Sequence, residues 1–167
     1  KDYVIASDTD SIYLHMGDLV EAVYKGREKT TEGIVGFLNK VCEVELEPYI
    51  ESSYQELADY VNAYDQKMIM KRENIASTGI WTAKKRYILN VHNSEGVQYA
   101  EPKLKIMGIE AIKSSTPEIV RTKFKEMFKI IIEGDENKTQ RFIADFRKAF
   151  TSLPPEEVSF PRGVKDI

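Results

Sequence analysis

The stretch "VIASDTDSIYL", residues 4–14, places two aspartates one residue apart between two short runs of strand-forming side chains. β-Branched and aromatic residues dominate both runs, and the Ser-Asp-Thr-Asp between them favours a turn. The pattern predicts a β-hairpin with Asp8 and Asp10 at its tip. Two carboxylates held this close repel one another unless water or a cation separates them.

A turn that presents Asp8 and Asp10 suits a hard divalent cation. Mg²⁺ fits best, because it takes one or two carboxylates, keeps several waters and completes its shell with substrate phosphates. A second metal at about 3.5–4 Å is the arrangement used in phosphoryl transfer, and it requires at least one more carboxylate. The alternative is an ordinary turn, since Asp, Thr and Ser are common turn formers and an isolated Asp-x-Asp is seldom a metal site.

The composition is typical of a globular protein, with 42% apolar and 31% charged residues among 167. There is no apolar run long enough to span a bilayer and no signal-peptide pattern at the N-terminus, so we expect a cytoplasmic protein with no membrane partner. A single cysteine, Cys42, excludes an internal disulfide. With only His15 and His92 beside it, a zinc cluster of Cys and His is excluded as well.

The net charge of −3 conceals a segregation along the chain. Residues 1–65 hold 14 acids and 5 bases, residues 66–129 hold 6 acids and 13 bases, and residues 130–167 are nearly balanced. A basic segment beside an acidic one can grip a phosphate backbone locally. The alternative is that exposed strands carry Lys and Arg to protect their edges.

Periodicity predicts an α+β fold. Apolar residues recur at helical spacing from Thr30 to Val61, with a kink or break at Pro48. Residues 67–77, 81–91 and 97–107 are strand-like, separated by turn signals at 77–79 and 92–96, and predict an antiparallel meander. A helix with Thr116 as N-cap and Pro117 as its first residue is expected to end at Gly134, and a second helix over 137–153 completes a helical hairpin.

Two further segments gather basic residues. In "WTAKKRYILNV" (81–91), strand alternation predicts Lys85 and Tyr87 on one face and Lys84 and Arg86 on the other, so that one face offers an ammonium and a phenol to a nucleic acid. In "EPKLKIMGIEAIKSSTP" (101–117), three lysines lead to a helix N-terminus that can bind phosphate; they are Lys103, Lys105 and Lys113. A solvated strand and ordinary helix capping are the alternatives for these two segments.

Together these segments resemble the palm and the beginning of the thumb of family B DNA polymerases, most closely those of T4-like bacteriophages. The sequence "SDTDS" (7–11) is similar to the family's third polymerase motif, Tyr-Gly-Asp-Thr-Asp-Ser. "KKRY" (84–87) is similar to the Lys-x-Tyr motif, and "KIMGIEAIKSSTP" (105–117) to the segment that links palm and thumb. The separations between the three also match the family, and the resemblance covers nearly the whole chain.

The resemblance implies a role for each matching residue. Asp10 would be the principal ligand of Mg²⁺, for which Mn²⁺ can substitute, Asp8 a weaker or outer contributor, and Thr9 a nucleotide contact. The residues implied to bind primer-template DNA are Lys84, Lys85, Arg86, Tyr87 and Lys113. The reaction implied is attack of a primer 3′-hydroxyl on the α-phosphate of a dNTP, assisted by two Mg²⁺ ions.

The resemblance also implies a palm over residues 1–108, an incomplete thumb over 109–167, and partners in the remaining polymerase domains and a sliding clamp. Ala6-Ser7 stands where the family has Tyr-Gly. The family's first and second motifs, which supply another metal-binding aspartate and a triphosphate-binding lysine, have no counterpart here. We therefore expect a fragment that is inactive alone, within a phage-infected host cell if the protein is viral.

The sequence is also compatible with two other functional classes of protein. One is a stand-alone, non-catalytic nucleic-acid-binding module built on the basic meander. The other is a metal-dependent phosphotransferase of another kind, which needs a third carboxylate such as Glu73 or Glu101.

Overall fold

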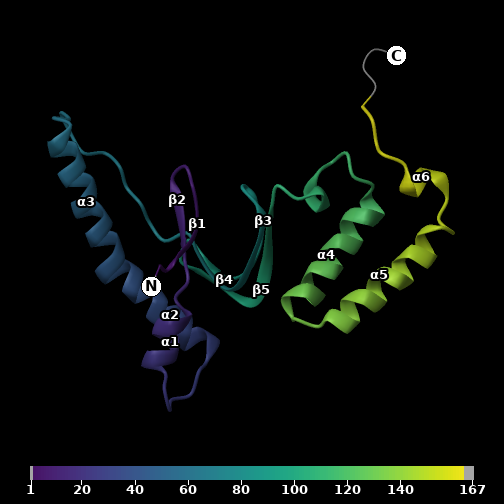
Figure 1. Ribbon diagram of the computed structural model, residues 1–167, viewed down its shortest axis with the longest axis horizontal. Coiled ribbons are helices and arrows are strands. Elements are labelled where there is room, and N and C mark those ends of the chain that lie inside the picture. Colours follow the sequence, from purple (N-terminus) through teal and green to yellow (C-terminus); the bar gives the residue numbers. More distant parts are fainter. Residues whose placement is uncertain (1, 164–167) are drawn as a thin grey trace. The chain divides into compact units, whose positions relative to one another are not determined.

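The computed structural model describes residues 2–163 and has a mixed α+β architecture (Figure 1). Two sheets are present in this range: a two-stranded sheet β1-β2 and a three-stranded sheet in the order β3-β4-β5. By its internal contacts the chain divides into unit 1, residues 1–75 and 92–102, and unit 2, residues 76–91 and 103–167. The boundary crosses all three strands of the larger sheet.

The predicted N-terminal hairpin is confirmed. Strands β1 (Val4–Asp8) and β2 (Ser11–Leu14) pair antiparallel, with Asp8 opposite Ser11. The register shifts between Val4 and Ala6, which leaves Ile5 as a bulge on β1. The turn is Thr9-Asp10, and Thr9 adopts a left-handed backbone with φ 53°.

Helices complete unit 1. Helix α1 (Gly17–Val23), which the sequence pattern does not predict, is followed by α2 (Thr31–Val41), whose N-cap Thr30 accepts from Gly33 N at 3.1 Å. A π-helical segment, η1 (Cys42–Leu46), joins α2 directly to α3 (Glu47–Tyr60). Of the two predicted outcomes at Pro48, a break does not occur, and the chain is instead π-helical immediately before α3. In the π turn immediately before Pro48, Glu47 N donates to Cys42 O. This local change in hydrogen bonding accommodates a proline, which has no backbone N–H to donate.

The three-stranded meander is confirmed with its third strand at the predicted bounds, but both bounds of each of the first two strands are wrong. Strand β3 (Asn74–Ala83) continues through residues 77–79, where a turn was expected, and residues 67–73 are not a strand. Gly79 fits inside β3 because the Trp81 ring and Leu89 occupy the space where a Cβ would lie. Strands β4 (Arg86–Ser94) and β5 (Val97–Met107) are joined at Glu95-Gly96, both with positive φ, as a tight hairpin requires.

The core of unit 2 lies between the sheet and helix α4 (Glu118–Ile132). Buried Ile88 from β4, Ala111 from the short 3₁₀ helix η2 (Glu110–Ile112) and Phe128 from α4 form its centre. Partly buried apolar residues surround them: Leu104, Ile106, Ile109, Phe124, Met127, Ile131 and Ile132. The cap prediction is shifted by one residue, since Pro117 is the N-cap and buried Thr116 precedes it.

The predicted helical hairpin is confirmed. Helix α4 is followed by Gly134, with φ 78°, and α5 (Glu136–Phe150) lies beside it (Figure 1). Asp135 caps α5 by accepting from Lys138 N at 2.8 Å. A single turn, α6 (Pro155–Val158), begins at the second proline of the Pro154-Pro155 pair. Within residues 2–163 no helix is both long and apolar enough to cross a membrane.

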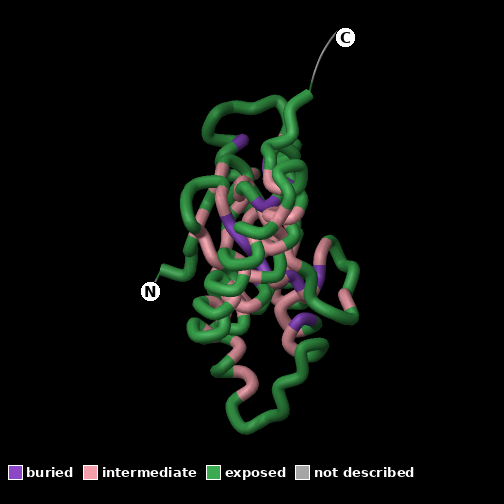
Figure 2. Tube along the Cα trace, turned by 90° about the vertical axis from the view of Figure 1, so that its right-hand side faces the viewer, coloured by how far each residue is buried: buried purple, intermediate pink, exposed green. Residues whose placement is uncertain are grey.

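Buried residues are few and occur as short separate stretches (Figure 2). In the described part of the chain no large side chain is completely buried. Several large apolar side chains are exposed instead, among them Tyr3, Val4, Ile5 and Ile12 on the hairpin and Tyr49, Leu57 and Tyr60 on α3. The structure thus leaves apolar faces of the hairpin and of α3 uncovered.

Candidate functional site

The two aspartates occupy the hairpin tip that the sequence predicts. Asp8 closes β1 and is half-buried, whereas Asp10 lies in the turn and is exposed. Thr9 Oγ1 donates to Asp8 Oδ1 at 3.1 Å, and Ser11 Oγ donates to the Asp8 carbonyl at 3.1 Å. These short-range hydrogen bonds tie the Asp8 carboxylate and backbone to the turn, so that the tip has a defined geometry.

Asp10 lines a hollow of about 750 Å³ in unit 1. The other lining residues come from α2, the π segment, α3, the 69–73 segment and the β4–β5 turn; they are Asn39, Glu43, Glu47, Ile69, Met70, Lys71, Arg72, Glu73, Glu95 and Gly96. Five carboxylates therefore face one concave surface together with two cations. Glu73, named above as a possible third carboxylate, shares this hollow with Asp10, and Glu101 does not line it.

Arg72 joins the segments that line this hollow. Its Nη1 donates to Asn93 Oδ1 at 2.7 Å, its Nη2 donates to Asn39 Oδ1, and its backbone N–H donates to Glu47 Oε1 at 3.1 Å. One arginine thus connects α2, the start of α3 and β4. Sequence reasoning missed it because the three partners are 21 to 33 residues away in the chain.

Cys42 lies in the π segment near this arginine. Burial raises the pKa of its thiol, and the charge of Arg72 opposes that shift. The thiol is therefore kept protonated at neutral pH. This agrees with the packing role of a cysteine in an apolar helical pattern rather than with a nucleophile.

The donors at the hairpin tip fit the ligand preference of Mg²⁺ but form an incomplete shell. Carboxylate oxygens are the ligands that Mg²⁺ favours, and one or two of them suffice when phosphates and waters complete the octahedron. Across residues 2–163 no group of three or more His, Cys, Asp or Glu side chains is arranged to hold a metal ion. Asp8 and Asp10 therefore fit an ion that arrives with further ligands.

The basic strand prediction is wrong in one respect. Lys84 and Lys85 do not alternate along a strand; they form the turn between β3 and β4, and Lys85 has a left-handed backbone with φ 61°. Both lysines are exposed. Tyr87 lies inside β4, is 8% exposed, and packs against Trp81 with ring centroids 6.1 Å apart. The lysines and the tyrosine thus do not share an exposed strand face.

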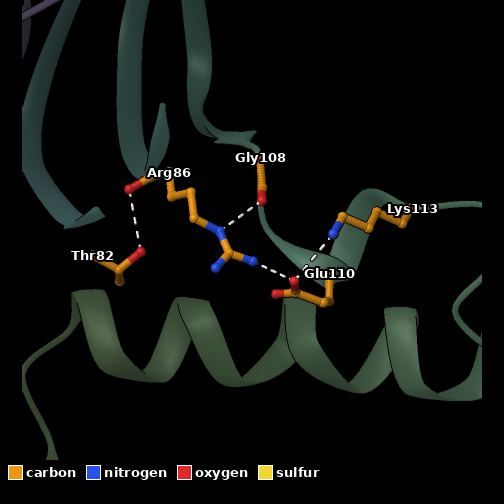
Figure 3. A network of polar contacts seen from close by, with 5 residues as sticks. All are labelled: Thr82, Arg86, Gly108, Glu110 and Lys113. Atoms are coloured by element: carbon orange, nitrogen blue, oxygen red, sulfur yellow. Dashed lines mark hydrogen bonds and ion pairs between the residues drawn. The ribbon is translucent and has the colours of Figure 1, made fainter. Parts of the chain in front are cut away.

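Arg86 and Lys113 meet at one carboxylate (Figure 3). Arg86 Nη2 donates to Glu110 Oε1, and Lys113 Nζ donates to the same oxygen at 3.2 Å. The hydrogen bond from its own backbone N–H, followed by that from Lys113, holds the pKa of Glu110 below its usual range. Glu110 was not predicted, although its three-residue spacing from Lys113 near a helical turn is a recognisable signal.

The segregation of charge along the sequence is also present between the two units. Unit 1 has 17 acidic and 8 basic residues, a net charge of −9, and unit 2 has 10 acidic and 16 basic residues, a net charge of +6. The aspartates belong to the acidic unit and the lysine turn to the basic one. A basic surface attracts a phosphate backbone, whereas an acidic one binds it only with the help of cations.

Comparison with known proteins identifies relatives of the chain. Residues 1–146 match the family model described as "Divergent Family B DNA polymerase". A DNA-directed DNA polymerase of Enterobacteria phage T4 is 35% identical over 175 residues, which cover 100% of this chain and 20% of that protein. One of Escherichia phage RB69 is 40% identical over 142 residues, 80% of this chain and 16% of that protein. The chain spans about a fifth or less of the length of these relatives.

Proposed function

The chain belongs to the divergent family B DNA polymerases, and we propose that it forms the part of such an enzyme that holds a catalytic metal and grips the primer strand. The observation that carries this is the family match over residues 1–146, which includes both the acidic hairpin and the lysine turn. The reaction is nucleotidyl transfer from a dNTP to a primer 3′-hydroxyl. Residues 1–108 would belong to the palm and 109–167 to the thumb.

In this proposal the hairpin tip is the metal-binding site. Asp10, exposed on the concave surface, is the principal ligand, and Asp8, tied down by Thr9, is the outer contributor. Mg²⁺, when bound there with the nucleotide, supplies charge neutralisation for the attacking and leaving oxygens. Thr9, whose backbone is left-handed, lies between the two aspartates in the turn, and we assign it a contact with the nucleotide.

The basic unit supplies the grip on DNA. Lys84 and Lys85 project from a tight turn, and Lys113 retains two ammonium hydrogens that Glu110 does not occupy. We assign Tyr87 to support of this turn through its contact with Trp81, because it is 8% exposed. The remaining polymerase domains, and a sliding clamp, would be its partners within a phage-infected host cell, and the chain alone would not polymerise.

The metal proposal is tested by titrating Mn²⁺ into the parent and into Asp8→Asn/Asp10→Asn, following the paramagnetic signal of the free ion. We expect weak binding by the parent and a loss of it in the variant. Glu51→Gln/Glu56→Gln, which removes two exposed charges from α3, is the matched control and should bind as the parent does. Equal binding by the two double variants would remove Asp8 and Asp10 from the metal site.

The DNA proposal is tested by fluorescence anisotropy with a labelled primer-template duplex. Binding should weaken steeply as salt rises, and Lys85→Ala and Lys113→Ala should each reduce the slope of log K against log salt by about one. Lys125→Ala, an exposed lysine of α4, is the control. A slope that neither substitution changes would contradict the assignment of these lysines.

A stand-alone nucleic-acid-binding module is the alternative that one observation favours, namely the net charge of +6 on unit 2. Such a module binds DNA without regard to the acidic hairpin. The two proposals separate in one experiment: a polymerase segment should bind primer-template more tightly with Mn²⁺ and a matching dNTP present, and Asp8→Asn/Asp10→Asn should abolish that gain. A module should show no gain.

A further inference from the structure

The guanidinium of Arg86 points toward residues 108–110, and its side chain is 40% exposed. Its Nε donates to the Gly108 carbonyl at 3.0 Å and its Nη2 donates to Glu110 (Figure 3). The Arg86 backbone carbonyl accepts from Thr82 Oγ1 at 3.2 Å. Two of the five guanidinium N–H donors, one on Nε and one on Nη2, are therefore engaged within unit 2, and they hold the side chain against residues 108–110.

Lys113 is held at the same carboxylate and keeps donors for an external anion. It shares the Glu110 oxygen with Arg86, so two cations face one carboxylate and the triad keeps a net charge of +1. About half of the Lys113 side chain is exposed. Its ammonium has three hydrogens and uses one of them here, so the other two can reach an external anion.

Gly108 connects this triad to the lysine turn. A Cβ at Gly108 would lie 2.1 Å from the Lys85 carbonyl oxygen, so only a glycine lets these two backbones touch. Its φ of +66° also favours glycine. Contacts therefore run without interruption from the Lys84-Lys85 turn through Gly108 and Arg86 to Glu110 and Lys113.

We infer that the Arg86–Glu110 pair is a positioning clamp, which fixes Lys113 relative to the Lys84-Lys85 turn so that primer phosphates meet a prearranged set of ammonium groups. Arg86 then acts through Lys113 and is not itself a DNA contact, unlike the role that the resemblance implies for it. The inference rests on the proposed function. Partly exposed ion pairs add little to folding stability. We therefore expect loss of the clamp to change the affinity for DNA and not the free energy of unfolding.

The first test is Arg86→Lys, which keeps the charge. A lysine ammonium cannot reach both Gly108 O and Glu110 as the planar fork does. We expect the dissociation constant for a labelled primer-template duplex to rise about threefold to tenfold, and the salt slope to fall by about one, as in Lys113→Ala. The double variant Arg86→Lys/Lys113→Ala should bind no more weakly than Lys113→Ala. Arg147→Lys, an exposed arginine of α5, is the control.

The second test is Glu110→Ala, for which charge and positioning predict opposite results. Removing a negative charge should by itself tighten DNA binding, whereas releasing Lys113 should weaken it. The matched control is Glu126→Ala, which frees Lys123 from an equivalent pairing three residues apart. We expect Glu110→Ala to bind DNA more weakly than the parent and Glu126→Ala to bind at least as tightly, with unchanged unfolding midpoints.

These experiments test the positioning clamp separately from the proposed binding of primer-template DNA. Tighter binding by Glu110→Ala, parental binding by Arg86→Lys, or additive losses in the double variant would overturn the clamp while leaving the DNA grip intact. A parent chain that does not bind primer-template DNA, or a Lys113→Ala variant that binds it as the parent does, would overturn both.

Discussion

Single residues decide the geometry of the basic surface, and Gly108 is the one with the least freedom. Its backbone lies against the Lys85 carbonyl, and its φ is +66°. Any side chain there meets both a steric clash and an unfavourable backbone conformation. The close approach of the lysine turn to the segment leading to α4 therefore requires a residue without a Cβ at position 108.

We predict that Gly108→Ala destabilises unit 2 by about 2–4 kcal/mol, the sum of a left-handed alanine and a displaced backbone contact. The measurement is chemical denaturation followed by circular dichroism. Gly134→Ala is the matched control, because Gly134 has φ +78° with open space around it and should cost about 1–2 kcal/mol for the backbone alone. Equal costs for the two variants would show that the close approach at Lys85 does not matter.

Asp135 shows how one titrating residue makes a helix sensitive to acid. The hydrogen bond from Lys138 N holds the pKa of the Asp135 carboxyl below its ordinary value of 3.8. Because the folded state binds the proton less readily than the unfolded state, the cap contributes fully above the ordinary pKa. Its contribution is lost as pH falls through the lower pKa of the folded state.

The expected result is that α5 loses stability below about pH 4 more steeply in the parent than in Asp135→Asn. Asparagine also caps a helix but does not titrate in this range. The unfolding midpoint of each protein, measured from pH 6 downward by circular dichroism, tests this. Parallel pH profiles would assign the acid sensitivity to other carboxylates.

At the scale of elements, unit 2 depends on the face that α4 presents to the sheet. Phe128 is 7% exposed and packs with Ile88 and Ala111 at the centre of the core cluster. Helix α5, in contrast, has no buried residue, and its aromatic side chains are only half-buried. The stability of the helical hairpin therefore comes chiefly from α4.

Replacing Phe128 by alanine is expected to cost about 3–5 kcal/mol, enough to unfold much of a marginally stable unit. Phe160→Ala, at a site that is 69% exposed, should cost close to nothing. Denaturant midpoints measure both. A small loss for Phe128→Ala would show that the packing of α4 on the sheet does not depend on this ring.

The elements that sequence predicts correctly are those set by local chemistry. The acidic hairpin follows from its turn residues, and α4 and α5 follow from helical periodicity and their bounding Gly134 and Pro154. The sequence predicts a strand at Lys84-Lys85 because neither residue is a usual turn former, yet the two residues form the turn between β3 and β4. Gly79 was read as a turn signal although tertiary packing against Trp81 explains it.

In the candidate site, too, the sequence predicts features that are set locally and does not predict those that depend on long-range contacts. Sequence alone places Asp8 and Asp10 at a hairpin tip, because the signal is local. The hollow around Asp10, with Asn39, Arg72 and Glu73, is built from segments that only tertiary folding brings together. The Arg86–Glu110 pair spans 24 residues and has no local signature.

The whole molecule combines an acidic unit, a basic unit and several large apolar side chains that are exposed. On α3, Tyr49 and Tyr60 are 73% and 85% exposed, and their spacing of eleven residues puts them on the same side of the helix. Exposed apolar surface of this kind marks an interaction site or an aggregation liability. Since the chain spans a fifth or less of its phage relatives, we expect other polymerase segments to cover this face.

In the chain by itself, the α3 face should bind a hydrophobic dye and promote self-association. We predict that Tyr49→Glu/Tyr60→Glu lowers the fluorescence of bound 1-anilinonaphthalene-8-sulfonate and raises the protein concentration at which oligomers appear in sedimentation velocity. The unfolding midpoint should not change, because side chains this exposed bury little area in the folded state. Phe160→Glu, which changes an exposed apolar residue of unit 2, is the control. If dye binding falls equally in both variants, the effect comes from added negative charge, and the α3 face is not the surface that other segments cover.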